Sequence, residues 1–303
     1  MLLAKILKPP YCYAWLNFKL LRKKKTAHWP FVARQIANTQ GLWPTFLSKN
    51  SHQTKTERHS NMKEIIGFFG GTFDPFHQAH AQLALAFCKQ YRLTRLYLTP
   101  TAQPHHRAEP SSNAAHRLAM LKLACEVLQV QTPTQLIVYD QEIKTQARGY
   151  TVETLTLLRQ RIGETAPLFM LIGADSLANL HTWKNHAQLL KLAHIVVAAR
   201  PDTDLARDLN PDIAELWRTK FSATSSLFVE NSLNFAACGT MSRLTAPLLA
   251  ISASKIRQQL GQNFAFSSIN PTDSAFLDSA FLDSALEPSV RAYIHTHKLY
   301  TPC

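Results

Sequence analysis

Two glycines followed by two histidines form the part of the sequence best suited to chemistry. Gly70 and Gly71 come directly after an apolar run, and without a Cβ their backbone can approach a ligand closely. Pro75 is suited to an early helical position, so we expect free N–H groups and the positive end of a helix dipole to face that ligand. His77 and His80 are three residues apart, which places both imidazoles on one face of such a helix. The segment predicts an anion site whose imidazoles donate hydrogen bonds to a polyphosphate and stabilise a leaving group.

Other interpretations of these residues remain open at this point. Two histidines at this spacing are also typical of surface positions, or of half of a metal site, although no third ligand lies nearby in the sequence. The glycine triplet of a dinucleotide-binding loop is missing, and so is the lysine motif of a P-loop. The remaining pattern is typical of a nucleoside triphosphate bound without a P-loop.

The elements that would position these residues follow an alternating pattern. From Met62 onward, short apolar runs alternate with amphipathic helical stretches, which is typical of a parallel sheet with crossover helices. The predicted fold class is therefore α/β, a doubly wound Rossmann-like parallel sheet with a small helical C-terminal part. Such sheets bind ligands at the carboxyl ends of their strands. The expected strands are Ile65–Phe69, Arg95–Thr99, Leu136–Tyr139, Leu168–Ile172, His194–Ala198 and Leu248–Ile251.

Helical periodicity fills the gaps between these strands. Apolar residues at helical spacing predict helices over His77–Tyr91, Asn113–Leu128 and Thr151–Ile162. Near the end of the chain, Glu287 and Pro288 open a last amphipathic helix. The unit DSAFL is repeated before it, and because five residues fit neither the helical nor the strand period, we expect a surface insertion at about 261–286.

The segment Gly70–His80 resembles the signature G-G-[ST]-F-D-P-x-H-x-G-H of the nucleotidyltransferase superfamily, with Ala79 where the family has glycine. Residues 62–303 as a whole are similar to the bacterial nicotinate-nucleotide adenylyltransferases. Further segments match that family in the same order: Pro104–Arg107, Gly149–Leu155, Gly173–Leu177, Thr182–Lys184 and Ile251–Arg257. Without the resemblance, we would interpret Pro104–Arg107 as a solvated basic loop. Thr151 and Asp175 would be helix caps, and Trp183 would be a core residue.

The resemblance implies roles for individual residues. It assigns catalysis to His77, His80 and Arg257, and nicotinate binding to Tyr150, Thr151 and Trp183. It assigns no residue to a metal, because Mg²⁺ would arrive with ATP. Lys184 replaces an aromatic residue of the family and, if it reaches the pyridine ring, adds a charge that favours a carboxylate. The residues implied in ATP binding are Gly70, Gly71, Thr72, His106, Arg107, Asp175, Ser252 and Ser254.

The implied reaction is transfer of the adenylyl group of ATP to nicotinate mononucleotide, which gives nicotinate adenine dinucleotide and pyrophosphate in NAD biosynthesis. The attacking phosphate oxygen is already ionised at neutral pH, so no general base is needed. Two alternatives stay open. One is another nucleotidyltransferase of the superfamily, such as pantetheine-phosphate adenylyltransferase, against which Tyr150, Thr151 and Trp183 argue. The other is a nucleic-acid-binding protein that acts through a basic N-terminal arm.

That arm carries most of the net charge of +13. Residues 1–61 contain eleven Lys and Arg against a single acid, Glu57, whereas the remaining residues contain 22 basic and 19 acidic residues. We expect 1–61 to be a basic extension that does not fold independently and 62–303 to be the nucleotidyltransferase domain. The extension is interpretable as a transit-like or membrane-surface leader, a nucleic-acid tail, or upstream sequence added by a start codon placed too early. The last is favoured, with Met62 as the natural start.

Composition limits where the protein works and with what. Five cysteines lie far apart without a C-x-x-C pair, and no run of eighteen apolar residues occurs. We therefore expect a cytoplasmic protein with no membrane segment. The expected partners are the small-molecule substrates ATP and nicotinate mononucleotide, with no nucleic acid for 62–303, and a homo-oligomer is left open.

Overall fold

The computed structural model describes residues 64–103, 109–146, 149–199, 205, 209–222, 236–246, 249–269 and 279–301. The chain divides into two units, and the second, Arg58–Cys303, contains all of these residues. The expectations for residues 1–61, and for Met62 as the natural start, lie outside the described residues.

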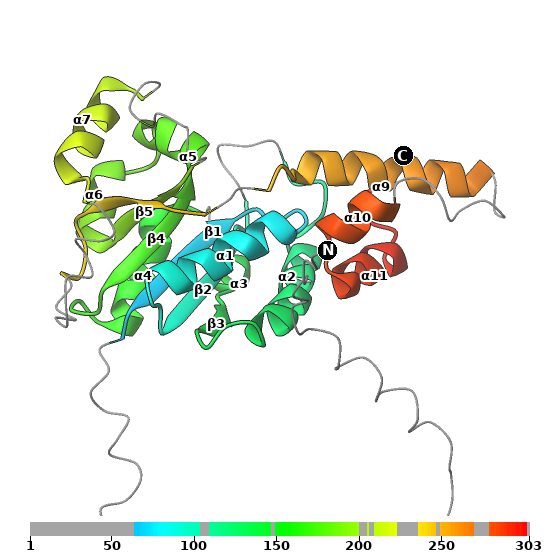
Figure 1. Cartoon of the computed structure of the whole chain (residues 1–303), viewed down its shortest axis with the longest axis horizontal. Helices are drawn as coiled ribbons and strands as arrows, with labels where there is room; N and C mark the ends of the chain where they lie inside the picture. The colour runs from blue at the N-terminus through cyan, green and yellow to red at the C-terminus, as the bar shows by residue number, and fades with distance from the viewer. Residues whose placement is uncertain are drawn as a thin grey trace, which may run out of the picture. The chain divides into compact units, whose positions relative to one another are not determined.

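A six-stranded parallel sheet forms the centre of this unit (Figure 1). Its strand order is β3-β2-β1-β4-β5-β6, so the order reverses between β1 and β4, which pair directly through Phe69 and Leu171. In sheets of this kind the ligand binds where the order reverses, outside the carboxyl ends of the strands. The predicted doubly wound sheet is confirmed. The strands are β1 (Ile66–Gly71), β2 (Arg95–Pro100), β3 (Gln135–Val138), β4 (Leu168–Gly173), β5 (His194–Ala198) and β6 (Met241–Leu244).

The sixth strand is not where the apolar pattern placed it. β6 pairs with β5 from Met241 to Leu244, whereas residues 249–251 of the predicted strand Leu248–Ile251 are not in a strand. β6 is only four residues long and includes Ser242, a polar residue that is fully buried. The hydroxyl of Ser242 is satisfied by a hydrogen bond of 2.8 Å with the hydroxyl of Tyr91, a tertiary contact that sequence periodicity does not reveal.

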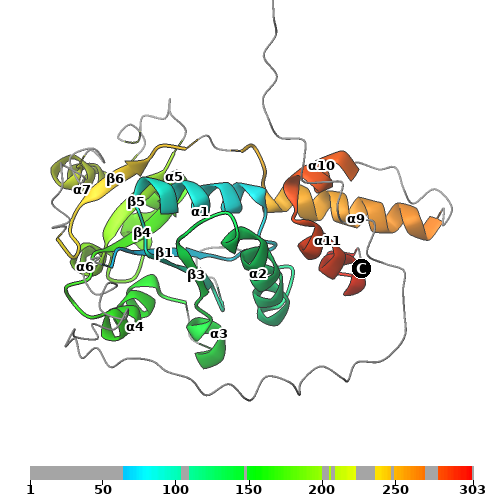
Figure 2. The same ribbon diagram turned by 60° about the horizontal axis from the view of Figure 1, so that its bottom comes forward.

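Helices cover both faces of the sheet (Figures 1 and 2). On one side lie α1 (Gln78–Gln90) and α2 (Ala114–Gln129), joined by the C-terminal helices α9 (Ala253–Ile269), α10 (Ser279–Ala285) and α11 (Pro288–Thr296). On the other lie α4 (Thr151–Ile162), α5 (Ala174–Ala178), η2 (Leu180–Thr182), α6 (His186–Leu192) and α7 (Pro211–Lys220). The short α3 (Gln141–Thr145) follows β3. None of the helices in the described ranges is long and apolar enough to cross a membrane.

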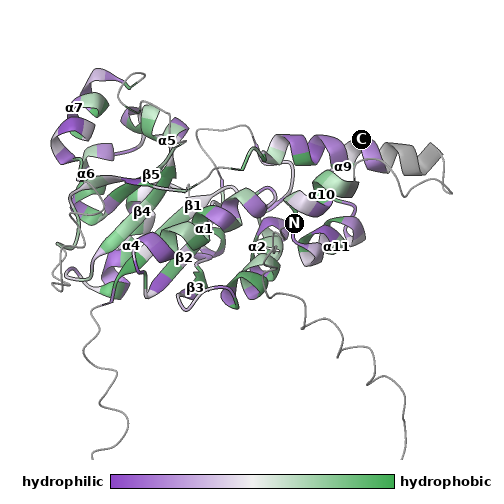
Figure 3. Ribbon diagram, in the orientation of Figure 1, coloured by the Kyte–Doolittle hydropathy of each residue, from purple (hydrophilic) through white to green (hydrophobic). Residues whose placement is uncertain are grey.

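Two separate cores result from this layering. Side chains that alternate along a strand point to opposite faces, so Phe69 and Leu171 enter one core while Phe68 and Met170 enter the other. The central strands are therefore apolar on both faces and appear as continuous hydrophobic segments in Figure 3. This is why short apolar runs without alternation located five of the six strands in the sequence.

Part of the predicted C-terminal surface insertion is buried in the structure. The surface insertion predicted at about 261–286 is wrong for its last part, because α10 buries Leu282 and Ala285. These two residues are three apart and form one apolar helical face within the core that also contains α1. Residues 270–278 of this segment lie outside the described residues. The last helix begins at Pro288 with Glu287 as its N-cap, as predicted.

Candidate active site

The loop after β1 leads from the carboxyl end of the strand into α1, and it contains the predicted anion site. Gly70 is exposed at the end of the strand, and Phe73 adopts a positive φ of 50°. Pro75 does not occupy an early helical position, because α1 begins only at Gln78 with His77 as its N-cap. It follows a cis Asp74–Pro75 peptide bond in the turn before the helix. The predicted helix start is thus confirmed to within one residue, but the proline belongs to the loop.

The two predicted catalytic histidines lie against each other. Their rings are stacked with centroids 3.8 Å apart, and the backbone N–H of His77 donates to Nδ1 of His80 at 3.3 Å. His77 is only 5% exposed, and its buried Nδ1 has no hydrogen-bond partner within the described part of the chain. Burial lowers the pKa of His77 to about 4, so the imidazole is neutral at pH 7. His77 can therefore offer a hydrogen bond to a phosphate without carrying a positive charge.

His80 is held by a cage of aromatic rings. Its ring lies 5.1 Å from the ring of Phe73, 5.3 Å from that of Phe76 and 6.2 Å from that of Phe69, measured between centroids. The phenylalanines belong to β1 and to the loop that follows it, so the signature sequence itself builds the cage. This packing fixes the position of the imidazole and excludes the interpretation that the histidine pair decorates the surface.

The third predicted catalytic residue reaches the same loop from the far end of the chain. Nη1 of Arg257 donates a hydrogen bond of 2.8 Å to the carbonyl oxygen of Asp74. Arg257 lies in the first turns of α9, whose start is capped by Ser252, because Oγ of Ser252 accepts from the N–H of Lys255 at 3.3 Å. The structure thus brings Arg257 to the loop that carries His77. Ser252 and Ser254 lie at the start of the same helix.

Asp175 follows the strand that pairs with β1. It lies in the first turn of α5, just beyond the carboxyl end of β4, and is exposed. The carboxylate of Asp175 lies over the backbone of Gly173, where a Cβ would be 2.5 Å from Oδ1 and would displace this side chain. The helix cap is Gly173, not Asp175. The predicted ATP-binding residues His106 and Arg107 lie outside the described residues.

The residues predicted to bind nicotinate come from two segments that lie together. Tyr150 is the N-cap of α4 and Thr151 is its first residue, so Thr151 is not the cap. Trp183 follows η2 and packs in part against the same core as Tyr150. Nζ of the adjacent Lys184 lies 4.3 Å from the centroid of the Tyr150 ring and 2.6 Å from Oε1 of Glu153 in α4.

Arg117 is an organising residue that sequence reasoning missed. It is 1% exposed, and its guanidinium donates to four carbonyl oxygens. These belong to Thr72 at 2.8 Å, Thr101 at 2.7 Å, Ala102 at 3.0 Å and Ser112 at 3.3 Å. One side chain therefore ties the loop after β1 to the loop after β2 and to the start of α2. The signal in the sequence is a cation placed on the apolar stripe of a predicted helix.

Glu142 holds the opposite side of the loop after β2. It is buried, accepts the hydroxyl of Thr154 at 2.6 Å and the N–H of Ala102 at 3.4 Å. Burial raises the pKa of Glu142, and the charge of Arg117 opposes that rise. The peptide groups around Ala102 are thus held by Arg117 from one side and by Glu142 from the other, and Thr154 links them to α4.

Asp74 fixes the signature loop from within. Its buried carboxylate accepts the N–H of Ser111 at 2.8 Å, the hydroxyl of Tyr300 at 2.7 Å and the hydroxyl of Ser112. Burial next to this carboxylate raises the pKa of Tyr300 far above its usual value, so the phenol stays protonated and donates. Both carboxylate oxygens are therefore engaged within the protein.

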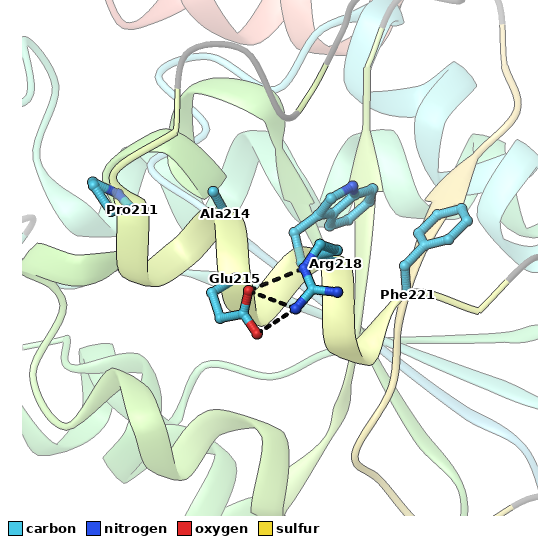
Figure 4. A pocket seen from close by; sticks show the side chains of 6 residues that line it. Pro211, Ala214, Glu215, Arg218 and Phe221 are labelled. Carbon is cyan, nitrogen blue, oxygen red and sulfur yellow. Dashed lines mark hydrogen bonds and ion pairs between the residues drawn. The ribbon is translucent and has the colours of Figure 1, made fainter.

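A surface hollow on α7 holds none of the predicted site residues (Figure 4). Glu215 and Arg218 form an exposed ion pair of 2.7 Å at its edge. Its lining residues are Pro211, Ala214, Glu215, Trp217, Arg218 and Phe221.

Comparison with known proteins identifies the family. A family model described as cytidylyltransferase-like matches residues 68–259. A probable nicotinate-nucleotide adenylyltransferase of Chromobacterium violaceum is 37% identical over 240 residues, covering 79% of this chain and 100% of the relative. The chain belongs to the nicotinate-nucleotide adenylyltransferase family. A second member of this family, from Laribacter hongkongensis, is 35% identical over 235 residues, covering 78% of this chain and 94% of the relative.

A solved structure shares the fold. The Plasmodium falciparum nicotinic acid mononucleotide adenylyltransferase, complexed with NaAD, aligns with a TM-score of 0.53 at 14% identity, covering 78% of this chain and 97% of that one. The family resemblance seen in the sequence motifs and the nucleotidyltransferase type of the sheet are both confirmed.

The depressed pKa of His77 predicts a loss of stability in acid. In the unfolded chain His77 binds a proton near the ordinary histidine pKa of 6.5, whereas in the folded chain it does so only at about 4. Stability therefore falls as the pH drops from about 7 towards 4. Between pH 7.5 and 5.0 we expect wild type to lose about 2 kcal/mol more than His77→Asn, measured by urea unfolding. Equal losses in the two proteins would contradict the burial argument.

The fork geometry of Arg117 predicts that lysine cannot replace it. A single ammonium group cannot reach four carbonyl oxygens on separate loops, so Arg117→Lys leaves buried acceptors unpaired. We expect a decrease of about 3 kcal/mol in the free energy of unfolding, measured by urea titration. Arg218→Lys, on the surface of α7, serves as the control and is expected to change little. A similar midpoint for both variants would show that the carbonyl contacts of Arg117 contribute no stability.

Proposed function

We propose that this chain transfers the adenylyl group of ATP to nicotinate mononucleotide and releases pyrophosphate, as a step of NAD biosynthesis. The observation that carries the proposal is the meeting of the signature loop, the stacked histidines and Arg257 at the point where the strand order reverses. Membership in the nicotinate-nucleotide adenylyltransferase family gives the reaction its donor and its acceptor.

The reaction needs orientation more than acid or base chemistry. A phosphate oxygen of the mononucleotide attacks the α-phosphorus of ATP, and the bond from that phosphorus to the oxygen bridging to the β-phosphate breaks. The nucleophile is already anionic at neutral pH, so its approach to the triphosphate is opposed by charge repulsion. We propose that His77 and His80 donate hydrogen bonds to the phosphates, and that Arg257 neutralises charge on the departing pyrophosphate.

The remaining predicted site residues are assigned either to ATP or to the acceptor. On the ATP side we propose the backbone of Gly70, Gly71 and Thr72, together with Asp175 and the residues His106, Arg107, Ser252 and Ser254. On the acceptor side we propose Tyr150, Thr151 and Trp183, because Lys184 brings the segment of Trp183 against the ring of Tyr150. Arg117 and Glu142 hold these loops in place and are positioning residues in this scheme.

A divalent cation, which we propose to be Mg²⁺, would neutralise part of the phosphate charge when it enters with ATP. Within the described residues no group of three or more His, Cys, Asp and Glu side chains could hold a metal ion. Asp74, the carboxylate nearest in sequence to the histidines, is already engaged by three donors. The donor set therefore fits a cation carried by the triphosphate itself, and the chain contributes by binding the phosphates.

The setting of the enzyme belongs to the same proposal. We place the reaction in the cytoplasm, where widely spaced cysteines stay reduced. The named relatives support nicotinate mononucleotide as acceptor over pantetheine phosphate. A nucleic-acid role of the basic extension stays an alternative, and the oligomeric state stays open.

The full chain should convert ATP and nicotinate mononucleotide into a dinucleotide and pyrophosphate, measured by chromatography and a coupled pyrophosphate assay. Pantetheine phosphate, as the alternative acceptor, should give no product.

In the same assay, His77→Asn or His80→Asn should lower kcat by about 10² to 10³, the usual effect of losing one donor to a developing charge. His295→Asn, an exposed position on α11, is the control and should retain wild-type kcat. If one of the two histidine variants keeps the wild-type kcat, that histidine has no role in the mechanism. If the wild type forms product with pantetheine phosphate and none with nicotinate mononucleotide, the proposed acceptor is wrong.

A further inference from the structure

The ammonium group of Lys184 lies beside two side chains at the start of α4, those of the N-cap Tyr150 and of Glu153. Its Nζ is 4.3 Å from the centroid of the Tyr150 ring and 2.6 Å from Oε1 of Glu153. The side chains of Lys184 and Glu153 are 45% and 49% exposed, so neither is a structural member of the core. The pair is open to a molecule that binds against Tyr150.

Glu153 places a negative charge at the start of α4. It lies in the first turn of the helix, the same turn as Thr151. The unpaired N–H groups of a first turn favour an anion such as a carboxylate. A second carboxylate bound there would lie within about one helical pitch, roughly 5 Å, of Glu153 and would be repelled by it. A neutral carboxamide in the same place would not be repelled.

Lys184 removes that repulsion. Its ammonium group pairs with Glu153 and so cancels the charge that an acidic ligand would meet at the start of α4. The carboxylate of nicotinate and the carboxamide of nicotinamide have nearly the same shape and differ in charge. Charge beside the ring is therefore a property that can distinguish them, in addition to the N–H donors that only the carboxamide carries.

We infer that Lys184 is a specificity-determining residue, which raises the preference for nicotinate over nicotinamide mononucleotide by neutralising Glu153. The inference rests on the proposed function, because it takes Tyr150 and Thr151 to lie beside the pyridine ring. It assigns opposite effects to the two members of one ion pair. Lys184 favours the acid, and Glu153 favours the amide.

The test compares wild type with Lys184→Gln, Glu153→Gln and the double variant. The measured quantity is the ratio of kcat/KM for nicotinate mononucleotide to kcat/KM for nicotinamide mononucleotide, at low ionic strength. Because both charges are partly screened by solvent, we expect changes of about threefold to tenfold. Lys184→Gln should lower the ratio, Glu153→Gln should raise it, and the double variant should return it to within about twofold of wild type.

Two controls separate a charge effect from a structural one. About 0.5 M KCl should reduce the differences between the variants, because exposed charges are screened at high salt. Arg218→Gln breaks an ion pair on α7, with Glu215 at 2.7 Å, which is more exposed than that of Lys184, and should leave the ratio unchanged. The KM for ATP should stay the same in all of these proteins.

The inference is overturned if the two single variants leave the ratio unchanged at low salt, or if they shift it in the same direction. Failure of the proposed function has a different signature, because wild type would then form no dinucleotide from either mononucleotide. If wild type forms dinucleotide and the single variants have the same kcat/KM ratio as wild type, the role of Lys184 is rejected and the proposed function stands.

Discussion

The buried guanidinium of Arg117 is the interaction on which the arrangement of the site depends. A guanidinium removed from water must have its N–H donors satisfied, and here the donors are directed to the carbonyl oxygens of Thr72, Thr101, Ala102 and Ser112. The loops after β1 and β2 and the start of α2 therefore cannot shift independently. Asp74 adds a buried charge in the same region, with Ser111, Ser112 and Tyr300 as its donors. The loop that leads into α1, where both histidines lie at the helix start, is held in place by charged hydrogen bonds from its neighbours.

Loops held in this way suit a reaction between two anions. The sheet supplies the crevice, since the order of strands reverses between β1 and β4. In the proposed mechanism the chemistry is assigned to segments from different parts of the chain: the signature loop, the start of α4, the residues after η2 and the first turns of α9. Holding two phosphate-bearing substrates in line replaces the covalent and acid–base steps that other enzymes need. A neutral, buried His77 is consistent with this scheme, because a hydrogen-bond donor is needed there and a proton acceptor is not.

Most of the fold could be predicted from the sequence because burial of the strands and helices determines the spacing of their apolar residues. A sheet buried on both faces gives short apolar runs, and helices that cover it give stripes, so five strands and the helices α1, α2, α4 and α11 were predicted from these patterns. β6 was not predicted because its buried Ser242 depends on a hydrogen bond with Tyr91, which the apolar pattern does not show. α10 was not predicted because its buried apolar face lies within a repeated unit that matches no helical period. The charged residues Arg117 and Glu142 escaped because their partners are carbonyl and N–H groups of distant loops. The motif residues themselves were found through the family signature, and the topology places the segments after β1 and β4 at the point where the strand order reverses.

The measurement that tests this account most directly is a crystal structure of the full chain with a non-hydrolysable ATP analogue and nicotinate mononucleotide. The account predicts phosphate oxygens within hydrogen-bond distance of His77, His80 and Arg257, and the pyridine ring beside Tyr150 and Trp183. It also predicts that the contacts of Arg117 with the loops after β1 and β2 stay unchanged, because the site is already formed. A triphosphate bound away from the stacked histidines, or a loop after β1 that moves away from Arg117 to admit it, would contradict the account.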